Sequence, residues 1–549
     1  MSDTPRPAAR WLATGLLCAL GAGVAVAAPE GASTQAAPGQ AVPVPVLTEG
    51  VGLLANLPVP AAISMEFART GDFAYVSSTT GIYTLDTSDP EAPRVLGVLP
   101  TVNFENESMT YGERRGADGE LERFVLLAVD LVEAGAGLDP ADPDPGSLNV
   151  GGLEVVVVDV TDPTAPFVRG RGPATTSTHT AQCLSQEQCD YAYTAGDGGA
   201  FSIIDLRDPS APVELTTVRS PAAGPGGSGF ADGAGHYWDV DGAGVAWHTG
   251  SGGTAAFDVT DPTAPVLLAA TGPQGRAPGL NDFIHHNSRR PNAERFVPGA
   301  EPSLANGNVL LVTEEDYFDG GEEVVCANAG SFQTWYVPDL DGAAYRAANP
   351  TGDVQDVGTI TNLDAVQAPT EFGGGLSTPA AAFCSAHWFD VHQDGFVAQG
   401  WYGAGLRILD VRDPREIAQL SYATFGATEV WDAYWVPLRD EAGVVTGRKS
   451  DLVYTTDAVR GVDVFEVALP AAPTGPEAPE GPQQPGGTGG TTGTTGTSGT
   501  GGTTGSSGTT GATGRRGALA ATGLPLLLPA AGLVLLLGGA VVQRRRPLG

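Results

Sequence analysis

Residues 155–163 read VVVVDVTDP, an apolar run that ends in Asp159 and is followed by an Asp-Pro turn. β-branched residues such as Val favour strands, while Asp caps nearby backbone amides and Pro fixes φ at a turn. The phrase returns at residues 82–86, 202–205, 256–258 and 408–410, with a degenerate copy at 462–465. A phrase repeated along the chain indicates an architecture built from successive β-sheets.

A second series of residues runs in step with these phrases. A polar residue, often His or Glu, stands upstream of each phrase and opens another predicted strand, as in His236-Tyr-Trp-Asp239 and His387-Trp-Phe-Asp390. The series comprises Glu66, Glu107, His179, His236, His286, His387 and Glu429. Its members predict seven sheets. The interval between His286 and His387 is long enough that an eighth sheet is an alternative. We assign this interval to one enlarged repeat, whose apolar phrase is at residues 335–339.

The strands predict an all-β fold, a seven-bladed β-propeller. The last blade offers only three strands, at 429–436, 452–455 and 462–467. Residues 51–55 resemble the outer strands that follow the Asp-Pro turns. We therefore expect this N-terminal strand to complete the last blade, which would leave no open sheet edge.

The six phrases resemble LVIVD repeats, named after the strand that they contain, and the resemblance covers most of residues 50–470. LVIVD repeats occur in bacterial and archaeal surface proteins and are expected to form β-propellers. The resemblance therefore implies a cell-surface propeller, without implying a particular biochemical activity.

The two ends of the chain carry targeting signals. Arg6 and Arg10 precede an apolar segment and a small-residue cleavage site, which predicts a signal peptide over 1–27 with the cut after Ala27. A disordered segment at 28–44 would precede the propeller at 45–470. Residues 471–517 are rich in Pro, Gly and Thr and predict a disordered stalk.

Residues 518–549 hold Leu519-Ala-Ala-Thr522-Gly523, an apolar run and terminal arginines. This order resembles a cell-wall sorting signal of the Leu-Pro-x-Thr-Gly type, in its Leu-Ala-x-Thr-Gly variant. The resemblance implies cleavage between Thr522 and Gly523 and linkage of Thr522 to peptidoglycan. The alternative is retention in the membrane by a C-terminal helix, for which the apolar run is long enough. In both cases we expect an extracellular protein anchored to the cell wall or membrane.

The net charge of −35 argues against nucleic acid and against anionic lipid as partners. We expect a monomer that binds an unknown extracellular ligand. Cys18 would be lost with the signal peptide, and the other four cysteines predict disulfides. Their short spacing pairs Cys183 with Cys189, which leaves Cys326 with Cys384, although spacing alone permits three connectivities.

The innermost strand of each blade lines the channel of a propeller, so the His and Glu series is expected to converge there. Imidazole and carboxylate groups together suit a transition metal, which is the only cofactor that the sequence suggests. The alternative is a structural role in which each side chain hydrogen-bonds a neighbouring blade. Glu314-Glu315-Asp316 is a separate acidic cluster, for which we expect a solvated turn rather than a calcium site.

These features favour an envelope-anchored binding or adhesion module over an enzyme. The alternative is a metal-dependent enzyme, an oxidoreductase or a hydrolase, that uses the His and Glu residues at the channel. A structural wall component is a third reading. No Gly-x-Ser-x-Gly motif supports a serine nucleophile, and the sequence identifies neither the ligand nor a catalytic residue.

Overall fold

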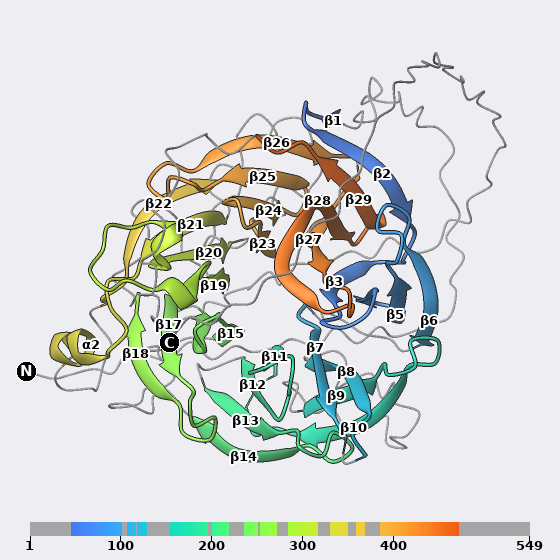
Figure 1. Ribbon diagram of the computed structural model, residues 1–549, viewed down its shortest axis with the longest axis horizontal. Coiled ribbons are helices and arrows are strands. Elements are labelled where there is room, and N and C mark those ends of the chain that lie inside the picture. The colour runs from blue at the N-terminus through green and yellow to red at the C-terminus, as the bar shows by residue number, and fades with distance from the viewer. Residues whose placement is uncertain are drawn as a thin grey trace, which may run out of the picture. The chain divides into compact units, whose positions relative to one another are not determined.

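The computed structural model describes residues 46–100, 107–116, 118–128, 154–176, 178–195, 200–218, 235–250, 253–271, 284–316, 330–349, 358–367, 385–425 and 427–470. Seven antiparallel sheets are arranged in a ring (Figure 1). The first strand of each sheet contacts the first strand of the next, in a closed circle around the central axis. The described part of the chain is therefore a seven-bladed β-propeller, as predicted, and the eight-bladed alternative is wrong.

The blades follow one another along the chain, each with its innermost strand first. Blades 1 to 3 are β3–β6 (Ala62–Phe67, Phe73–Ser78, Gly81–Asp86, Arg94–Pro100), β7–β10 (Thr110–Arg115, Leu121–Ala128, Glu154–Asp159, Phe167–Pro173) and β11–β14 (Thr180–Cys183, Tyr191–Ala195, Phe201–Asp205, Val213–Val218). Blades 4 to 6 are β15–β18 (Gly235–Val240, Val245–Gly250, Gly253–Asp258, Val266–Ala270), β19–β22 (Ile284–Arg289, Val309–Glu315, Ser331–Tyr336, Thr361–Gln367) and β23–β26 (Phe389–Val391, Phe396–Gly400, Leu406–Asp410, Ala418–Thr424).

Blade 7 is closed by the N-terminal strand. Its own strands are β27 (Val430–Arg439), β28 (Val445–Asp457) and β29 (Gly461–Val467), and β2 (Val51–Leu57) pairs antiparallel with β29. The predicted closure is confirmed. β1 (Val46–Leu47), which the sequence does not predict, pairs with β26 and adds a fifth strand to blade 6. The N-terminal segment thus joins blades 6 and 7.

The apolar phrases form the third strand of their blades, where both faces are buried. Val155 and Val157 pack toward blade 3, in one cluster with Ala181, whereas Val156 and Val158 pack toward blade 1, in another cluster with Tyr75. A strand between two neighbouring blades needs apolar residues at every position rather than at alternate ones. Each fully buried Val contributes on the order of 1.5–3 kcal/mol, which explains why the phrase is continuously apolar.

The acidic ends of the phrases make paired turns. The Asp159 carboxylate accepts a hydrogen bond from the Thr161 amide at 2.9 Å, and the Asp162 carboxylate accepts one from the Thr164 amide at 2.9 Å. In blade 4, Asp258 and Asp261 cap Thr260 and Thr263 in the same way, also at 2.9 Å. These caps give hydrogen-bond partners to backbone amides in the turns, which have none in the sheet. They therefore fix where each third strand ends.

Blade 5 is enlarged, as expected from the long interval in the series. Two 3-10 helices, η2 (Ala293–Arg295) and η3 (Leu304–Asn306), lie between β19 and β20, and helix α2 (Ala343–Ala348) lies between β21 and β22. Its third strand, Ser331–Tyr336, overlaps the phrase assigned to it.

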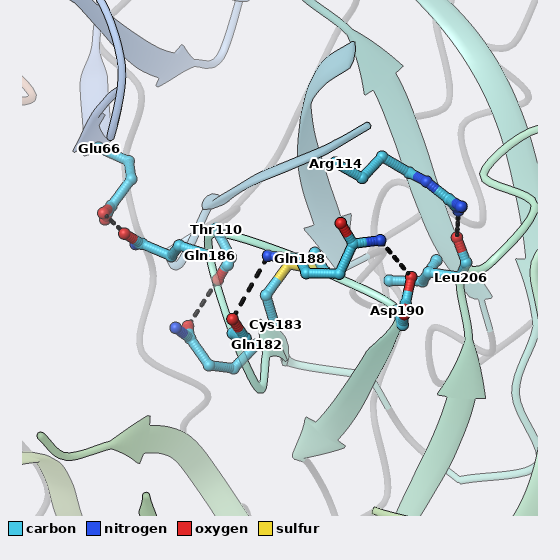
Figure 2. Close-up of a disulfide and its surroundings, with 11 residues drawn as sticks. Glu66, Thr110, Arg114, Gln182, Cys183, Gln186, Gln188, Asp190 and Leu206 are labelled. Carbon is cyan, nitrogen blue, oxygen red and sulfur yellow. Dashed lines mark hydrogen bonds between the residues drawn. A yellow bond between two sulfur atoms is a disulfide. The ribbon is translucent and has the colours of Figure 1, made fainter. Parts of the chain in front are cut away.

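The predicted disulfide between Cys183 and Cys189 is confirmed, with a Cα–Cα distance of 5.4 Å (Figure 2). It closes the loop between β11 and β12. Cys18, Cys326 and Cys384 lie outside the described residues, as do Ala27, Leu519, Thr522, Gly523 and the predicted stalk. Within the described ranges, no helix is long and apolar enough to cross a membrane.

Candidate metal centre

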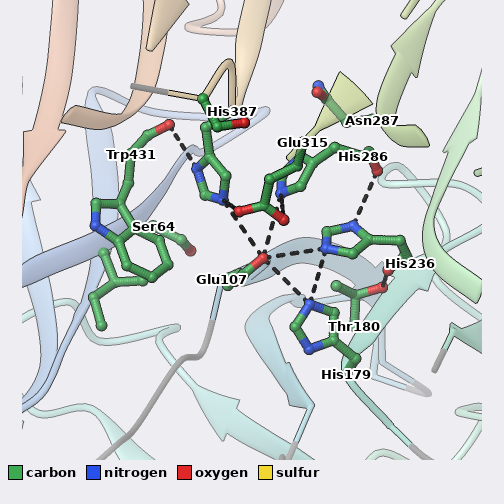
Figure 3. A network of polar contacts seen from close by, with 12 residues as sticks. Ser64, Glu107, His179, Thr180, His236, His286, Asn287, Glu315, His387 and Trp431 are labelled. Atoms are coloured by element: carbon green, nitrogen blue, oxygen red, sulfur yellow. Dashed lines mark hydrogen bonds and ion pairs between the residues drawn. The ribbon is translucent and has the colours of Figure 1, made fainter. Parts of the chain in front are cut away.

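Five members of the predicted series meet at the central axis, at the beginning of the innermost strands (Figure 3). His236 lies in β15 and His286 in β19, whereas Glu107, His179 and His387 lie within the three residues that precede β7, β11 and β23. A register shift between Gly235 and Tyr237 leaves His236 as an extra residue opposite β16. A bulge changes the direction in which a side chain points, and here the His236 imidazole points toward the axis. We call these five residues the histidine cluster.

The Glu107 carboxylate is the centre of the cluster. Its Oε2 atom lies 3.2 Å from His179 Nε2, 3.4 Å from His236 Nε2, 3.4 Å from His286 Nε2 and 3.6 Å from His387 Nε2. The Nε2 atoms of His179 and His236 are themselves 3.0 Å apart. Four imidazoles from four blades therefore direct the same nitrogen at one carboxylate oxygen.

Two of the imidazoles have a fixed tautomer. His236 Nδ1 lies 3.0 Å from the backbone oxygen of His286, and His387 Nδ1 lies 3.0 Å from the backbone oxygen of Trp431. Because a carbonyl oxygen can only accept, both Nδ1 atoms must carry hydrogen. In the neutral form of each ring, the Nε2 atom then directs a lone pair into the cluster, which is the orientation that metal-binding histidines receive from an outer hydrogen bond.

Burial sets the charge states of the cluster. Burial lowers the pKa of His236 to about 4, and repulsion from His179 acts in the same direction. Burial also lowers the pKa of His286 well below its ordinary value. For Glu107, burial would raise the pKa, but attraction to His179 and a hydrogen bond from that ring hold the pKa well below its usual range. Near neutral pH, His236 and His286 are thus neutral and Glu107 is ionised, which are the forms that bind metals.

Glu315, at the end of β20, is a further carboxylate beside the cluster that the series did not include. Its Oε2 lies 4.0 Å from His286 Nε2, and its Oε1 lies 3.9 Å from His387 Nε2. The Tyr402 hydroxyl donates a hydrogen bond to Glu315 at 2.6 Å. The expectation of a solvated turn at 314–316 is wrong, because all three acidic residues are buried and Glu314 and Glu315 lie within β20.

Glu66 and Glu429, the other two members of the series, do not join the cluster. Glu66 accepts a hydrogen bond from Gln186 at 2.8 Å, and Glu429 accepts one from the Trp431 indole at 3.1 Å. The strand registers explain the difference. The extra residue of the bulge is Ile63 in β3 and Trp431 in β27, so these two residues occupy the position that His236 has in β15.

Ile63 and Trp431 pack together with Tyr402 in a small apolar cluster. Blades 1 and 7 therefore contribute an apolar wall where blades 2 to 6 contribute polar groups. The convergence predicted for seven polar residues holds for five.

The remaining histidines have structural positions. His248 stacks on the Trp238 indole, with ring centroids 4.2 Å apart. His285 Nδ1 lies 2.9 Å from the Thr254 hydroxyl, and His392 Nε2 lies 3.0 Å from the Gln393 side chain. None of the three belongs to the groups of His and acidic side chains that are close enough to share an ion in the described structure.

The donor set fits a transition-metal ion. Two overlapping groups of potential ligands are present, Glu107 with His236 and His286, and Glu315 with His286 and His387. Ligands bound at about 2.1 Å from one ion lie about 3.0–3.4 Å from one another. The distances of 3.0–3.6 Å within the histidine cluster are close to this range. Imidazole nitrogens with one carboxylate favour Zn, Fe, Cu or Ni over Mg or Ca.

The chain has only distant similarity to solved structures. No curated protein matches the sequence. The β-propeller domain of Cps50 (Swd1) from Myceliophteria thermophila is 13% identical, with 76% of this chain and 100% of that chain covered and a TM-score of 0.44. Hydrazine synthase from Kuenenia stuttgartiensis is 11% identical, with 75% and 97% covered and a TM-score of 0.41.

The family model described as LVIVD repeat matches residues 188–219. This segment holds strands β12, β13 and β14 of blade 3, including the phrase that ends at Asp205. The match supports the resemblance that was drawn from the repeated phrases: the chain carries an LVIVD repeat within a seven-bladed β-propeller.

Proposed function

We propose that this protein is a metal-binding propeller in which one transition-metal ion is held by the histidine cluster. The observation that carries the proposal is the convergence of four Nε2 atoms on Glu107 Oε2, at 3.2–3.6 Å. A purely structural hydrogen-bond network would pair each imidazole with a different partner. Here the four side chains come from four blades and share one point, and the hydrogen bonds at His236 Nδ1 and His387 Nδ1 leave their Nε2 atoms available to a ligand.

The cluster is most accessible at one member. The side chain of His179 is 21% exposed, whereas those of His286 and His387 are fully buried. A bound ion would therefore be approached by water or another ligand from the side of blade 3. This asymmetry suits a binding module that presents a metal to a ligand, since a closed structural metal site would have no accessible side.

A metal-dependent enzyme is the second candidate, and the pair of Glu315 and Tyr402 favours it. The bound metal would supply Lewis-acid or redox chemistry. Glu315 is buried beside His286 and His387 and is oriented by the Tyr402 hydroxyl. Tyr402 has a φ of 37°, which is rare for a residue other than glycine. Such strain is retained mostly where function requires it, and Glu315 is the carboxylate that would hold or move a proton.

The location of the protein is a separate proposal. The signal peptide, the stalk and the sorting signal support export and attachment to peptidoglycan through Thr522, with membrane retention as the alternative. On that basis the metal centre would act outside the cell, at the end of the stalk. Adhesion to another surface would then use the loops of the propeller rather than the histidine cluster.

Metal analysis by inductively coupled plasma mass spectrometry tests the proposed function. We would compare the purified full chain with a triple variant, His179→Ala, His236→Ala and His387→Ala, and with His392→Ala as a matched control outside the cluster. We expect about one equivalent of a transition metal in the parent and the control, and none in the folded triple variant. Absence of metal from the parent after reconstitution with Zn²⁺, Fe²⁺, Cu²⁺, Ni²⁺ and Mn²⁺ would contradict the proposal.

A further inference from the structure

A pocket of about 200 Å³ lies further along the innermost strands than the histidine cluster. Arg289 and Asp390, which line it, each follow a cluster histidine by three residues on the same blade. The buried Trp388 indole lies between the two regions, since its ring centroid is 4.6 Å from that of His286 and 4.6 Å from that of Tyr237. Tyr237 in turn contacts Arg289. The pocket is thus a second region on the axis, separate from the metal centre.

One wall of the pocket is an elaboration of blade 7. Strands β27 and β28 have 10 and 13 residues, which makes them the longest strands of the described chain, and Lys449 on β28 lines the pocket. The hairpin is attached to blade 1 by backbone hydrogen bonds from Gly71 to Gly443 at 2.9 Å and from Val445 to Arg69 at 3.0 Å. This wall is therefore held in place and does not depend on the ligand for its position.

The opposite wall is fixed by the disulfide loop. Gln186 lies between Cys183 and Cys189, and its side-chain amide donates to Glu66 at 2.8 Å (Figure 2). The backbone oxygen of Gln186 also accepts a hydrogen bond from the Glu113 amide at 2.8 Å. Three elements that are distant in sequence thus build the pocket from polar side chains.

The lining is basic in a chain that is strongly acidic. The sequence has 63 acidic and 28 basic residues, and Lys449 is its single lysine. Arg69, Arg289, Arg448 and Lys449 line the pocket together with only two acidic residues, Glu66 and Asp390. Lys449 is oriented by a hydrogen bond to Asp390 at 2.6 Å.

The Arg289 guanidinium has an edge that the described protein does not use. Its Nη1 atom donates to Asp239, and to the Tyr237 hydroxyl at 3.3 Å. Among the described residues, its Nε and Nη2 atoms donate to no protein acceptor, and the side chain is 27% exposed. These two N–H groups form the planar fork that matches the two oxygens of a carboxylate.

We propose that this pocket binds a small organic carboxylate, held by Arg289 through two hydrogen bonds and by Lys449 through its ammonium group. The volume suits a ligand of a few carbon atoms. Glu66 supports this assignment, because burial raises the pKa of Glu66 to about 7 against the attraction of Arg289. A neutral Glu66 can donate a hydrogen bond to a ligand oxygen rather than repel it.

Isothermal titration calorimetry of the full chain with malonate and succinate tests this proposal, with malonamide and sulfate as comparison ligands. We expect saturable binding of one carboxylate ligand per chain and no binding of the uncharged diamide. Absence of saturable binding of both carboxylates at millimolar concentration would overturn the proposal. Equal binding of sulfate would overturn the assignment to carboxylates.

Variants locate the binding. We expect Lys449→Met to weaken malonate binding at least about tenfold, since a charge-assisted hydrogen bond is lost, and Lys449→Arg to restore most of it. The double variant Arg289→Gln with Asp239→Asn should also lose at least about tenfold while leaving no unpaired charge. Arg460→Gln, outside the pocket, is the control. Unchanged affinity in the folded Lys449→Met and double variants would overturn the proposal.

The single lysine provides an independent measurement. Reductive methylation with ¹³C-formaldehyde labels only Lys449 and the α-amino group, so one lysine signal is expected in the NMR spectrum. Malonate should shift this signal along a saturable curve, and the shift should disappear in the double variant of Arg289 and Asp239. A signal that is unaffected by malonate would count against the pocket as the binding site.

Discussion

The histidine cluster and the pocket lined by Arg289 and Lys449 use the same innermost strands in opposite ways. In the cluster, burial keeps His236 and His286 neutral around one ionised Glu107. Three residues beyond His236, His286 and His387, the side chains are charged and paired, as in the contact of Arg289 with Asp239. Neutral nitrogens that share one point are suited to a cation, whereas paired charges with an unused guanidinium edge are suited to an anion. The same innermost strands therefore place neutral imidazoles at one end and charged side chains three residues further along.

The largest expected effect concerns the paired charges of the pocket. Arg289→Gln should lower the free energy of unfolding by about 3 kcal/mol, because Asp239 would be left largely buried without its partner. Urea denaturation measures this change. The double variant with Asp239→Asn should recover most of the loss. An Arg289→Gln variant with the same free energy of unfolding as the parent would contradict this prediction. It would mean that Asp239 does not depend on Arg289 for a compensating charge.

The next effect concerns the shared carboxylate of the cluster. Glu107→Gln keeps the size of the side chain but removes its charge, so metal affinity should fall about 100-fold, which corresponds to about 2.7 kcal/mol. Competition with a chromophoric chelator measures the affinity. Glu66→Gln is the matched control, since Glu66 lies in the pocket and should leave metal affinity unchanged. An equal loss of metal affinity in Glu107→Gln and Glu66→Gln would contradict the assignment of the metal to the histidine cluster alone.

A smaller effect is expected from the outer contact of Glu315. Tyr402→Phe removes the hydroxyl that donates to Glu315 at 2.6 Å, and metal affinity should fall about tenfold, the lower end of the range for residues that orient metal ligands. The same chelator competition applies, with Tyr83→Phe on the outer part of blade 1 as the control. A loss as large as that in Glu107→Gln would mean that Glu315 binds the metal directly.

The smallest effect lies outside both regions, in the turns. Hydrogen bonds from Ser88 lower the pKa of Asp86 to about 2. A lowered pKa in the folded state stabilises the fold above the unfolded value near 4, and this contribution is lost as the pH falls toward 2. Asp86→Asn should therefore reduce the loss of stability between about pH 4 and pH 2, by less than about 1 kcal/mol because its ion-pair partner Arg94 is exposed and surface pairs contribute little. Urea titrations at both pH values check this, and an unchanged pH dependence would contradict it.

The sequence was sufficient to predict the propeller because its signals are local and repeated. The continuous Val run and the Asp-Pro turn at residues 155–163 reflect burial between two blades and capping of the turn, and both follow from residue type. The closing strand β2 was predictable for the same reason. β1 was missed because Val46–Leu47 is too short to show a pattern.

The candidate site was only partly predictable. Five of the residues carry His or Glu where the strand enters the axis, and spacing alone identified them. Glu66 lies three residues after the bulged Ile63, and Glu429 lies two residues before the bulged Trp431. Both were misplaced because the sequence does not show which residue of a strand takes the bulged position. Glu315 comes from a second strand, so no series contains it. The pocket had no signal beyond the single lysine, since its walls come from distant segments.

The most direct test of the metal centre is anomalous diffraction from crystals of the full chain grown with the metal that it retains on purification. We predict one strong anomalous peak about 2.1 Å from the Nε2 atoms of the cluster histidines, enclosed by His179, His236, His286 and His387 with Glu107. Crystals without a peak at the axis, or with a peak only at His248 or His392, would contradict it.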